Sequence, residues 1–285
     1  MDPDFILDLA NQAIKLRMYP FFDIAHCAIT CMYVREDLAS GAQVFSRKHP
    51  LACWISSMFS IYAGAILSGV LLAEPVLTPF NNNNQVILAT IVWYLIFYSP
   101  FDIVYKVCKF LPIKLILASF KEIYRCKKVH DGVVHAAKIY PNGYLIMIII
   151  GAVKGNGSNF TKIFERLLRG IWTPAAIEIL QPGLPAKTAV VAAVIFVLDK
   201  KTEFITAPQA LVYLGIILFF VYFKLTSLLL GIDHFVPFEN LFCALFLGGF
   251  WDALSKAFTT SKNETAAIKI DGAKNGKSDS AKKKD

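Results

Sequence analysis

Apolar residues gather along this chain in long blocks, which polar or charged stretches separate from one another. A helix needs about 20 mostly apolar residues to cross the hydrocarbon core of a membrane. Blocks of this kind lie near residues 18–34, 51–73, 86–105, 139–153, 188–198, 208–231 and 238–254, the fifth starting near Leu184. Spanning strands would instead give segments of about ten residues with alternating polarity. The pattern therefore predicts an all-α integral membrane protein with seven transmembrane helices.

The composition agrees with a membrane protein. Hydrophobic residues make up 56% of the chain, charged residues 18%, and the mean hydropathy is +0.52. Soluble domains have about a quarter of their residues charged. The opening, MDPDFILDLANQAIKL, is acidic at Asp2, Asp4 and Asp8 and lacks the basic start of a cleavable signal peptide. We therefore expect the first apolar block to act as its own insertion signal.

The sequence contains no clear catalytic or metal-binding cluster. It has six cysteines without a C-x-x-C pair. Cys27 and Cys31 would share a helix face, but two thiols make a poor metal site, so we expect buried, apolar cysteines. His130, Asp131 and His135 come nearest to a cluster, and their spacing matches no zinc pattern. We expect neither an enzyme nor a metal site, and no nucleic acid as a partner.

The distribution of basic residues predicts the orientation of the chain, because lysines and arginines near span ends stay in the cytoplasm. With the N-terminus in the lumen, the cytoplasmic segments hold most of these residues, including those from Lys106 to Lys138 and those after Leu254. We therefore expect a lumenal N-terminus and a cytoplasmic C-terminus. The same scheme places the glycosylation tripeptides at Asn156 and Asn159 in a lumenal connection.

The last stretch of the chain differs from the rest. From about Ser255 it is polar and lysine-rich, and too poor in apolar residues to fold alone. It ends in KKKD, which is either a solvated tail or a dilysine signal of the kind that retrieves membrane proteins to the endoplasmic reticulum. We predict that residues 255–285 form a disordered cytoplasmic tail.

Two groups of three spans resemble each other. Three landmarks recur in the same order in both groups: Tyr19-Pro20 with Tyr140-Pro141, Pro50 with Pro185, and Gln85 with Gln209. Because three is an odd number, the second group must enter the membrane from the opposite side, which makes an inverted repeat. We expect one membrane domain over residues 1–254, composed of repeat one (15–110), a basic connector (111–137), repeat two (138–232) and a seventh span (238–254).

Two stretches carry a resemblance to a known family. They are KEIYRCKKV, from Lys121 to Val129, and AKIYPNGYLIMIIIGAVKGNG, from Ala137 to Gly157. With them, residues 15–255 resemble the trimeric intracellular cation channels, the TRIC family of the endoplasmic and sarcoplasmic reticulum, in their eukaryotic type B form. This chain has Ile123 where the family has valine, a change of one methylene.

The resemblance implies a homotrimer in that membrane with one pore in each protomer. The pore would pass potassium and other monovalent cations and so balance charge while calcium leaves or re-enters the store. The resemblance also implies a bound phosphoinositide, phosphatidylinositol 4,5-bisphosphate, at the basic element. A secondary transporter of a small solute, built on the same inverted repeat, is the alternative function.

The basic element contains a stripe of residues that share one helix face. Lys121, Arg125, Lys128, Gly132 and His135 follow i, i+4, i+7, i+11 and i+14. One interpretation is a cytoplasmic anchor that fixes topology and attracts anionic lipid. The other is a headgroup pocket, in which the three basic residues bind inositol phosphates and Gly132 leaves room at the membrane. The resemblance favours the pocket, so Lys121, Arg125, Lys128 and Gly132 form the candidate phosphoinositide site.

Ionisable and small residues inside the spans are the candidates for the pore: Asp23, Ser68, Gly69, Lys138, Lys154 and Lys224. Asp23 and His26 share a helix face, and they either line the pore or form a buried pair. Ser68 and Gly69 either kink the second span at the pore or serve helix packing.

Two further patterns predict contacts rather than pore residues. Asp102 precedes Lys106 by four residues, so we expect an interfacial ion pair between them. Gly151 and Gly155 form a G-x-x-x-G pattern, which favours tight helix packing over a place in the pore.

Overall fold

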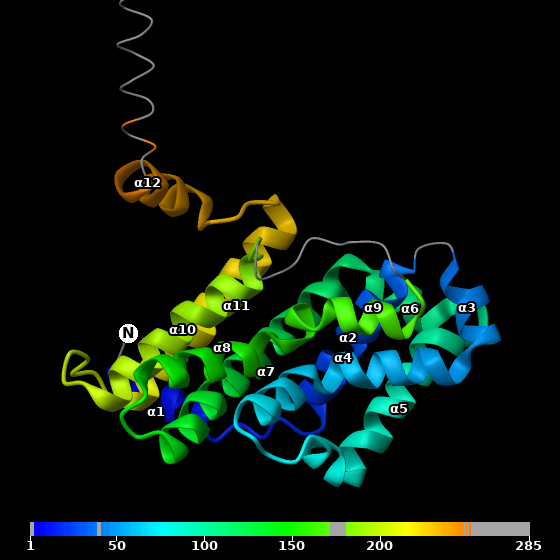
Figure 1. Ribbon diagram of the computed structural model, residues 1–285, viewed down its shortest axis with the longest axis horizontal. Helices are drawn as coiled ribbons and strands as arrows, with labels where there is room; N and C mark the ends of the chain where they lie inside the picture. The colour runs from blue at the N-terminus through cyan, green and yellow to red at the C-terminus, as the bar shows by residue number, and fades with distance from the viewer. Residues whose placement is uncertain (1–2, 39–40, 172–180, 248, 250, 252–285) are drawn as a thin grey trace, which may run out of the picture. The chain divides into compact units, whose positions relative to one another are not determined.

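The computed structural model describes residues 3–38, 41–171, 181–247, 249 and 251. Across this part of the chain the regular elements are helices (Figure 1), as the sequence predicts. In chain order they are α1 (Pro3–Ile14), α2 (Phe21–Asp37), α3 (Ala42–Lys48), α4 (Pro50–Leu71), η2 (Thr78–Asn81), α5 (Asn83–Tyr98), η3 (Pro100–Asp102), α6 (Ile103–Lys109), α7 (Leu111–Ile139), α8 (Tyr144–Phe160), α9 (Lys162–Leu168), α10 (Leu184–Lys201), α11 (Gln209–Leu230) and α12 (Val236–Phe246). They belong to two compact units, residues 1–232 and 233–285.

Fewer helices pass a simple test for membrane spans than the sequence predicts. Within the described residues, α4 and α11 are long and apolar enough to cross a membrane. α5 and the Pro100–Lys109 segment together make a third candidate, although a bend of 91° separates them. The other helices are shorter or carry more charged side chains. Seven apolar spans are therefore not confirmed by length and composition alone.

The predicted seventh span is described only in part. We expect residues 238–254 to cross the membrane, and within the described residues α12 covers Val236–Phe246. The last residues of that span, and the predicted tail at 255–285 with its KKKD ending, lie outside the described residues.

The basic stretch forms the long helix α7 at the centre of the first unit. Its 29 residues correspond to a length of about 43 Å, and it packs against α2, α8, α10 and α11. The side chains of Lys121 and Arg125 are only 7% and 9% exposed. The sequence analysis expects this stripe at the cytoplasmic surface, and the structure instead buries it. The charged residues lower the hydropathy of this stretch, yet several of them face other helices of the protein.

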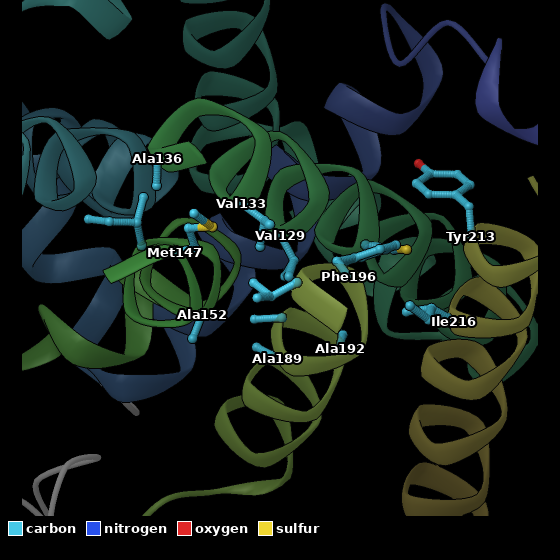
Figure 2. Packing of buried hydrophobic residues seen from close by; sticks show 14 of the residues in the cluster. Val129, Val133, Ala136, Met147, Ala152, Ala189, Ala192, Phe196, Tyr213 and Ile216 are labelled. Carbon is cyan, nitrogen blue, oxygen red and sulfur yellow. The ribbon is translucent and has the colours of Figure 1, made fainter. Parts of the chain in front are cut away.

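Small residues allow the helices around α7 to approach closely. Figure 2 shows Val129 and Val133 of α7 beside Ala189 and Ala192 of α10. A Cβ atom on Gly151 of α8 would lie 2.6 Å from Val133 Cγ2, and one on Gly155 would lie 2.3 Å from Val129 Cγ2. The G-x-x-x-G pattern therefore serves tight packing, as predicted. Four of the six cysteines are also buried as expected: Cys27, Cys31, Cys53 and Cys126.

Two pairs of helices in this unit run antiparallel. Near its start, α2 places Asp23 by Tyr124 and Lys128, and further on it places Thr30 by Lys121, so α2 and α7 have opposite directions. The helix α4 starts near α9, where Cys53 interacts with Glu165 and Arg169. It then meets α8 at Gly64, which faces Lys154 and Gly157. α4 and α8 are therefore antiparallel too.

The end of α8 lies on the same side as the end of α2. Asp37, the last residue of α2, is 2.7 Å from Arg169 and 3.5 Å from Lys162, both of which follow α8. The sequence analysis put these residues on opposite sides of the membrane, and that prediction is wrong. The reason is α7, whose length reverses the direction of the chain once more before α8 begins. Asn156 and Asn159, near the end of α8, move to the side of Asp37 with it.

Candidate functional site

A polar cavity of about 120 Å³ lies inside the first unit, where α2, α4, α7 and α8 meet. It is large enough for a few water molecules. Most of its polar lining comes from Asp23, His26, Ser60, Lys121, Arg125, Lys128, Lys154 and Ser158. Five of these residues, Asp23, Lys121, Arg125, Lys128 and Lys154, are sequence-predicted site residues. The structure therefore brings part of each predicted site together in one place.

The basic side of the cavity comes from α7. Lys121 Nζ donates a hydrogen bond to Thr30 Oγ1 at 3.4 Å and lies 4.7 Å above the ring of Tyr33. Arg125 Nη1 donates to Glu122 Oε2 at 2.6 Å, an ion pair within one helical turn. Lys128 Nζ lies 4.9 Å from the ring centre of Tyr124. Each cation thus has an aromatic ring or a polar group as a partner, which offsets part of the cost of burial.

The acidic side of the cavity comes from α2. Asp23 is 5% exposed and accepts a hydrogen bond from Tyr124, while Lys128 attracts its charge. Its Oδ2 atom is buried and makes no hydrogen bond with the described residues. The sequence left open whether Asp23 lines a pore or pairs with His26. Its neighbour His26 has other contacts, since its Nε2 lies 3.0 Å from the carbonyl of Ile61 and its ring stacks on Tyr124.

A second cavity, of about 310 Å³, lies next to the first and nearer the end of α2. It is lined by Thr30, Tyr33, Val34, Glu36, Asp37, Ser60, Ser158, Asn159, Lys162 and Glu165. Ser60 of α4 and Ser158 of α8 line both cavities. The two cavities are therefore neighbours, with these serines between them. Sequence reasoning missed them, because a serine in an apolar helix is common and its neighbour across the cavity is not visible in the sequence.

The closest approach of two backbones in this region lies beside these serines. A Cβ atom on Gly64 would be 2.3 Å from the carbonyl oxygen of Lys154, and one on Gly157 would be 2.2 Å from Gly64 Cα. No larger residue fits either position without moving α4 away from α8. The glycines flanking Asn156 in the sequence were the available signal for this contact.

The helical break lies in α8 rather than in α4. Asn156 has non-helical angles of φ −128° and ψ 18°, and Asn159 Nδ2 donates to its side chain at 3.0 Å. The sequence predicted a possible kink at Ser68 and Gly69, but α4 continues through both residues. Ser68 Oγ donates to the carbonyl of Ala65 at 3.1 Å, a bond that an unbroken helix accommodates. The kink at Ser68 and Gly69 is therefore not observed.

The other predicted site residues lie outside both cavities. A Cβ atom on Gly132 would come within 2.9 Å of Gly151 Cα, so this glycine allows α7 to pack on α8. Gly69 has open space around its Cα, and Lys138 is exposed at the end of α7. Lys224 of α11 is half-buried and interacts electrostatically with Glu122.

A network of charges closes the far end of the second cavity, and the sequence analysis missed it. Arg169 Nη2 donates to Asp37 Oδ2 at 2.7 Å and to Glu165 Oε2 at 2.6 Å. Burial alone would raise the pKa of Asp37, but the hydrogen bond and charge of Arg169 hold it below its usual value. For Glu165, burial outweighs the same arginine, and its pKa is raised. Glu165 and Arg169 are one helical turn apart, but Asp37 and Arg169 are 132 residues apart, so no local pattern indicates that pair.

Asp102 pairs with a different residue from the one predicted. Arg35 Nη2 lies 3.0 Å from Asp102 Oδ2, and Gln43 also donates to this carboxylate. The sequence analysis expected Lys106 as the partner. Asp102 precedes α6 with a left-handed backbone, φ 58°, so the helical spacing that brings residues i and i+4 together does not apply.

The sequence can now be compared with known proteins. Residues 39–231 match the TRIC channel family. The chain is 49% identical to trimeric intracellular cation channel type 1B.1 of Caenorhabditis elegans over 268 residues, which cover 94% of this chain and 91% of the relative.

Solved structures agree with this match. A trimeric intracellular cation channel from C. elegans, solved in the absence of Ca²⁺, has a TM-score of 0.77 and 45% identity, covering 82% of this chain and 100% of that one. A second structure, described as a basis for the activity of TRIC counter-ion channels in calcium release, has a TM-score of 0.74 and 35% identity, covering 79% and 99%.

These relatives are named as ion channels, so the fold and the polar interior belong to a membrane channel protein and not to an enzyme. The chain is a member of the TRIC channel family.

Proposed function

We propose that this chain is a potassium-permeable monovalent cation channel that works as a homotrimer with one pore in each protomer. The observation that carries the proposal is a pair of neighbouring polar cavities that share Ser60 and Ser158 in their walls. Hydroxyl and carboxylate oxygens along this route can replace part of the hydration shell of a cation. The name of its relatives, trimeric intracellular cation channel, supports both the trimer and the cation.

Seven helices of the first unit cross the membrane in this proposal: α2, α4, α5, α7, α8, α10 and α11. The basic helix α7 takes the place of the span predicted at 238–254. The antiparallel pairs α2–α7 and α4–α8 support two inverted repeats, α2–α4–α5 and α7–α8–α10, with α11 as the seventh helix. Seven crossings leave the N-terminus in the lumen and the C-terminus in the cytoplasm.

The distribution of basic residues supports the same orientation after this revision. The connections after α2, α5 and α8, together with the chain after α11, hold most of the lysines and arginines. The opposite side of the membrane holds only Lys15, Arg17, Lys138, Lys200 and Lys201.

The proposed place of action is the membrane of the endoplasmic or sarcoplasmic reticulum. A flow of potassium there balances the charge that calcium carries as it leaves or re-enters the store. One support is the description of a structural relative as a counter-ion channel in calcium release. The other is the word "intracellular" in the names of the relatives.

The same site suggests how a phosphoinositide regulates the channel. Lys121, Arg125 and Lys128 line the route. Glu122 and Asp23 offset only part of their positive charge, and the remainder would repel a cation there. The phosphates of phosphatidylinositol 4,5-bisphosphate carry the opposite charge and suit arginine and lysine as partners. The cavity of about 120 Å³ admits such a headgroup only if α7 and its neighbours separate. We therefore propose that a bound lipid both neutralises the positive charges along the route and widens it.

Single-channel recording tests the first part of this proposal. The purified full-length protein is fused with a planar bilayer that separates a high from a low concentration of potassium chloride. We expect unitary openings with a reversal potential that indicates cations over chloride, and a mass in nanodiscs that corresponds to a trimer. Solute uptake into vesicles without unitary openings would instead indicate the alternative, a secondary transporter.

A double substitution tests the lipid site. Lys121→Ala with Arg125→Ala should abolish binding of phosphatidylinositol 4,5-bisphosphate and reduce open probability, while the protein still inserts and assembles. Lys127→Ala is the matched control, because Lys127 lies on the same helix but pairs with Asp131 at 2.9 Å and is not among the residues lining the cavities. If the double variant binds phosphatidylinositol 4,5-bisphosphate with the same preference as the wild type, α7 has no role in lipid binding.

A further inference from the structure

The connection between α5 and α7 is a rigid bend, which we call the elbow (residues 99–111). The axes of α5 and of the segment Pro100–Lys109 differ by 91°. Phe101 and Asp102 both have left-handed backbones, with φ 53° and 58°. The ion pair of Asp102 with Arg35 and the bond from the Val104 amide to Ser99 Oγ at 3.3 Å hold the bend. The turn is therefore determined by specific contacts.

The helix α6 in the elbow has three distinct faces. At 100° per residue, Val104, Tyr105 and Cys108 point in one direction, and they pack against the hydrophobic core of α2, α4 and α5. Ile103 and Val107 form a second face and are 54% and 46% exposed. The third face carries Lys106 and Lys109, which are also exposed. A helix that only met protein and water would not need the second face.

The apolar face continues beyond α6 at both of its ends. Phe101 precedes the helix and is 87% exposed, the largest value among the exposed large apolar side chains of the described residues. Phe110 and Leu111 follow it and are 61% and 54% exposed. Lys114 adds a positive charge one turn into α7. Aromatic and basic residues side by side are typical of segments at the boundary between lipid and water.

The direction of α6 fits that boundary. In the proposed topology α5 crosses the membrane, so a segment at 91° to it lies along the membrane plane. The elbow is also on the side of Arg35 and of α3, since Tyr98 hydroxyl donates to the carbonyl of Ser46 at 2.7 Å. This is the cytoplasmic side in the proposed orientation, and the cytoplasmic leaflet is the one rich in anionic lipid.

We propose that the elbow is a membrane-surface binding site for anionic phospholipids, separate from the cavity site on α7. Ile103, Val107 and Phe110 enter the outer part of the hydrocarbon layer. Lys106, Lys109 and Lys114 bind phosphate groups of the cytoplasmic leaflet as point charges. The inference rests on the proposed crossing of α5, and its test below does not depend on ion conduction.

Spin labelling tests the position of the elbow in the membrane. In the full-length protein with Cys108→Ser and Cys243→Ser, a nitroxide is attached to single cysteines at Ile103, Lys106, Val107, Lys109 and Phe110. Labels at the three apolar positions should be accessible to oxygen, and labels at the two lysines to a water-soluble nickel chelate. If the depth of the labels in the membrane rises steadily from residue 103 to residue 110, α6 continues the span of α5, and the proposal is overturned. Apolar positions that neither reagent reaches would mean a protein contact, such as another copy, and would overturn it too.

Lipid selectivity tests the charges. The reporter is spin-labelled phosphatidylserine compared with phosphatidylcholine, in vesicles without phosphoinositide. Lys106→Gln, Lys109→Gln and Lys114→Gln together should lower the preference for phosphatidylserine several-fold, towards equal binding. Lys200→Gln with Lys201→Gln, at the opposite end of the bundle, should not change it. An unchanged preference in the triple variant would overturn the proposal. If the spin labels show the periodic depth pattern but no unitary currents are recorded, the result contradicts the proposed channel function and leaves the lipid site at the elbow supported.

Discussion

Single glycines decide how closely the helices around the cavities approach. Gly64 and Gly69 lie five residues apart on α4, yet their surroundings are opposite. A Cβ atom on Gly64 would overlap the backbone of Lys154, whereas Gly69 has no atom within 4 Å of its Cβ position. The sequence singled out Gly69 because, with Ser68, it interrupts an apolar span. The structure gives Gly64 the closer contact, since only the facing helix determines which glycine is needed.

We predict that Gly64→Ala destabilises the protein and that Gly69→Ala does not. The added methyl group at Gly64 forces α4 and α8 apart, and overpacking of this kind costs about 1–3 kcal/mol. At Gly69 alanine has room, and it favours a helix by about 0.5–1 kcal/mol over glycine. Thermal unfolding in detergent should show a lower Tm for Gly64→Ala and an equal or higher Tm for Gly69→Ala. If Tm falls by the same amount in both variants, the close contact assigned to Gly64 is contradicted.

At the scale of elements, a charge network joins helices that are distant in the sequence at one end of the second cavity. Arg169, whose side chain is fully buried, joins α9 to the last residue of α2. The sequence could predict that Lys121, Arg125 and Lys128 share one face of a helix, because that depends only on helical spacing. It could not predict what faces them, or that Asp37 meets Arg169, because such partners depend on the packing of separate helices.

The pKa of Asp37 predicts how this network responds to acid. A carboxylate whose pKa is lowered by folding stabilises the folded state fully above its ordinary value of 3.8 and loses that contribution as the pH falls below it. We expect wild-type protein to unfold at a higher temperature than Asp37→Asn at neutral pH. The difference should shrink once the pH falls below 3.8, and Glu165, present in both proteins, should affect it little. A difference that grows in acid would exclude the ion pair.

At the scale of the whole molecule, hydropathy predicted the all-helical fold and the positions of α2, α4, α8, α10 and α11. It failed for α7, because a helix surrounded by other helices can carry lysine and arginine without exposing them to lipid. Because α7 was not counted as a crossing, the predicted sides of the later segments changed as well. In the proposed topology α7 crosses the membrane, so each later segment up to the end of α11 lies on the side opposite to the one predicted.

Labelling of exposed positions tests the revised topology. Val44 of α3, Phe164 of α9 and Phe204 between α10 and α11 are 57%, 61% and 85% exposed. Each is replaced by cysteine in a protein with Cys108→Ser and Cys243→Ser. In sealed microsomes an impermeant maleimide should label Val44→Cys and Phe164→Cys from outside, and Phe204→Cys only after detergent is added. Labelling of Phe164→Cys and Val44→Cys from opposite sides would restore the topology predicted from hydropathy.

The contact between Gly64 and Gly157 has a mechanical consequence. Two backbones touch there without side chains between them, at the wall of the first cavity and next to the serines that it shares with the second. Such a contact works as a fulcrum. When α8 tilts about it, the gap to α4 opens at one end and narrows at the other, as in a lever whose arms are the two halves of the helix. A ligand that widens the cavity at Lys121 would then narrow the gap near Asp37, while the helices keep their internal structure.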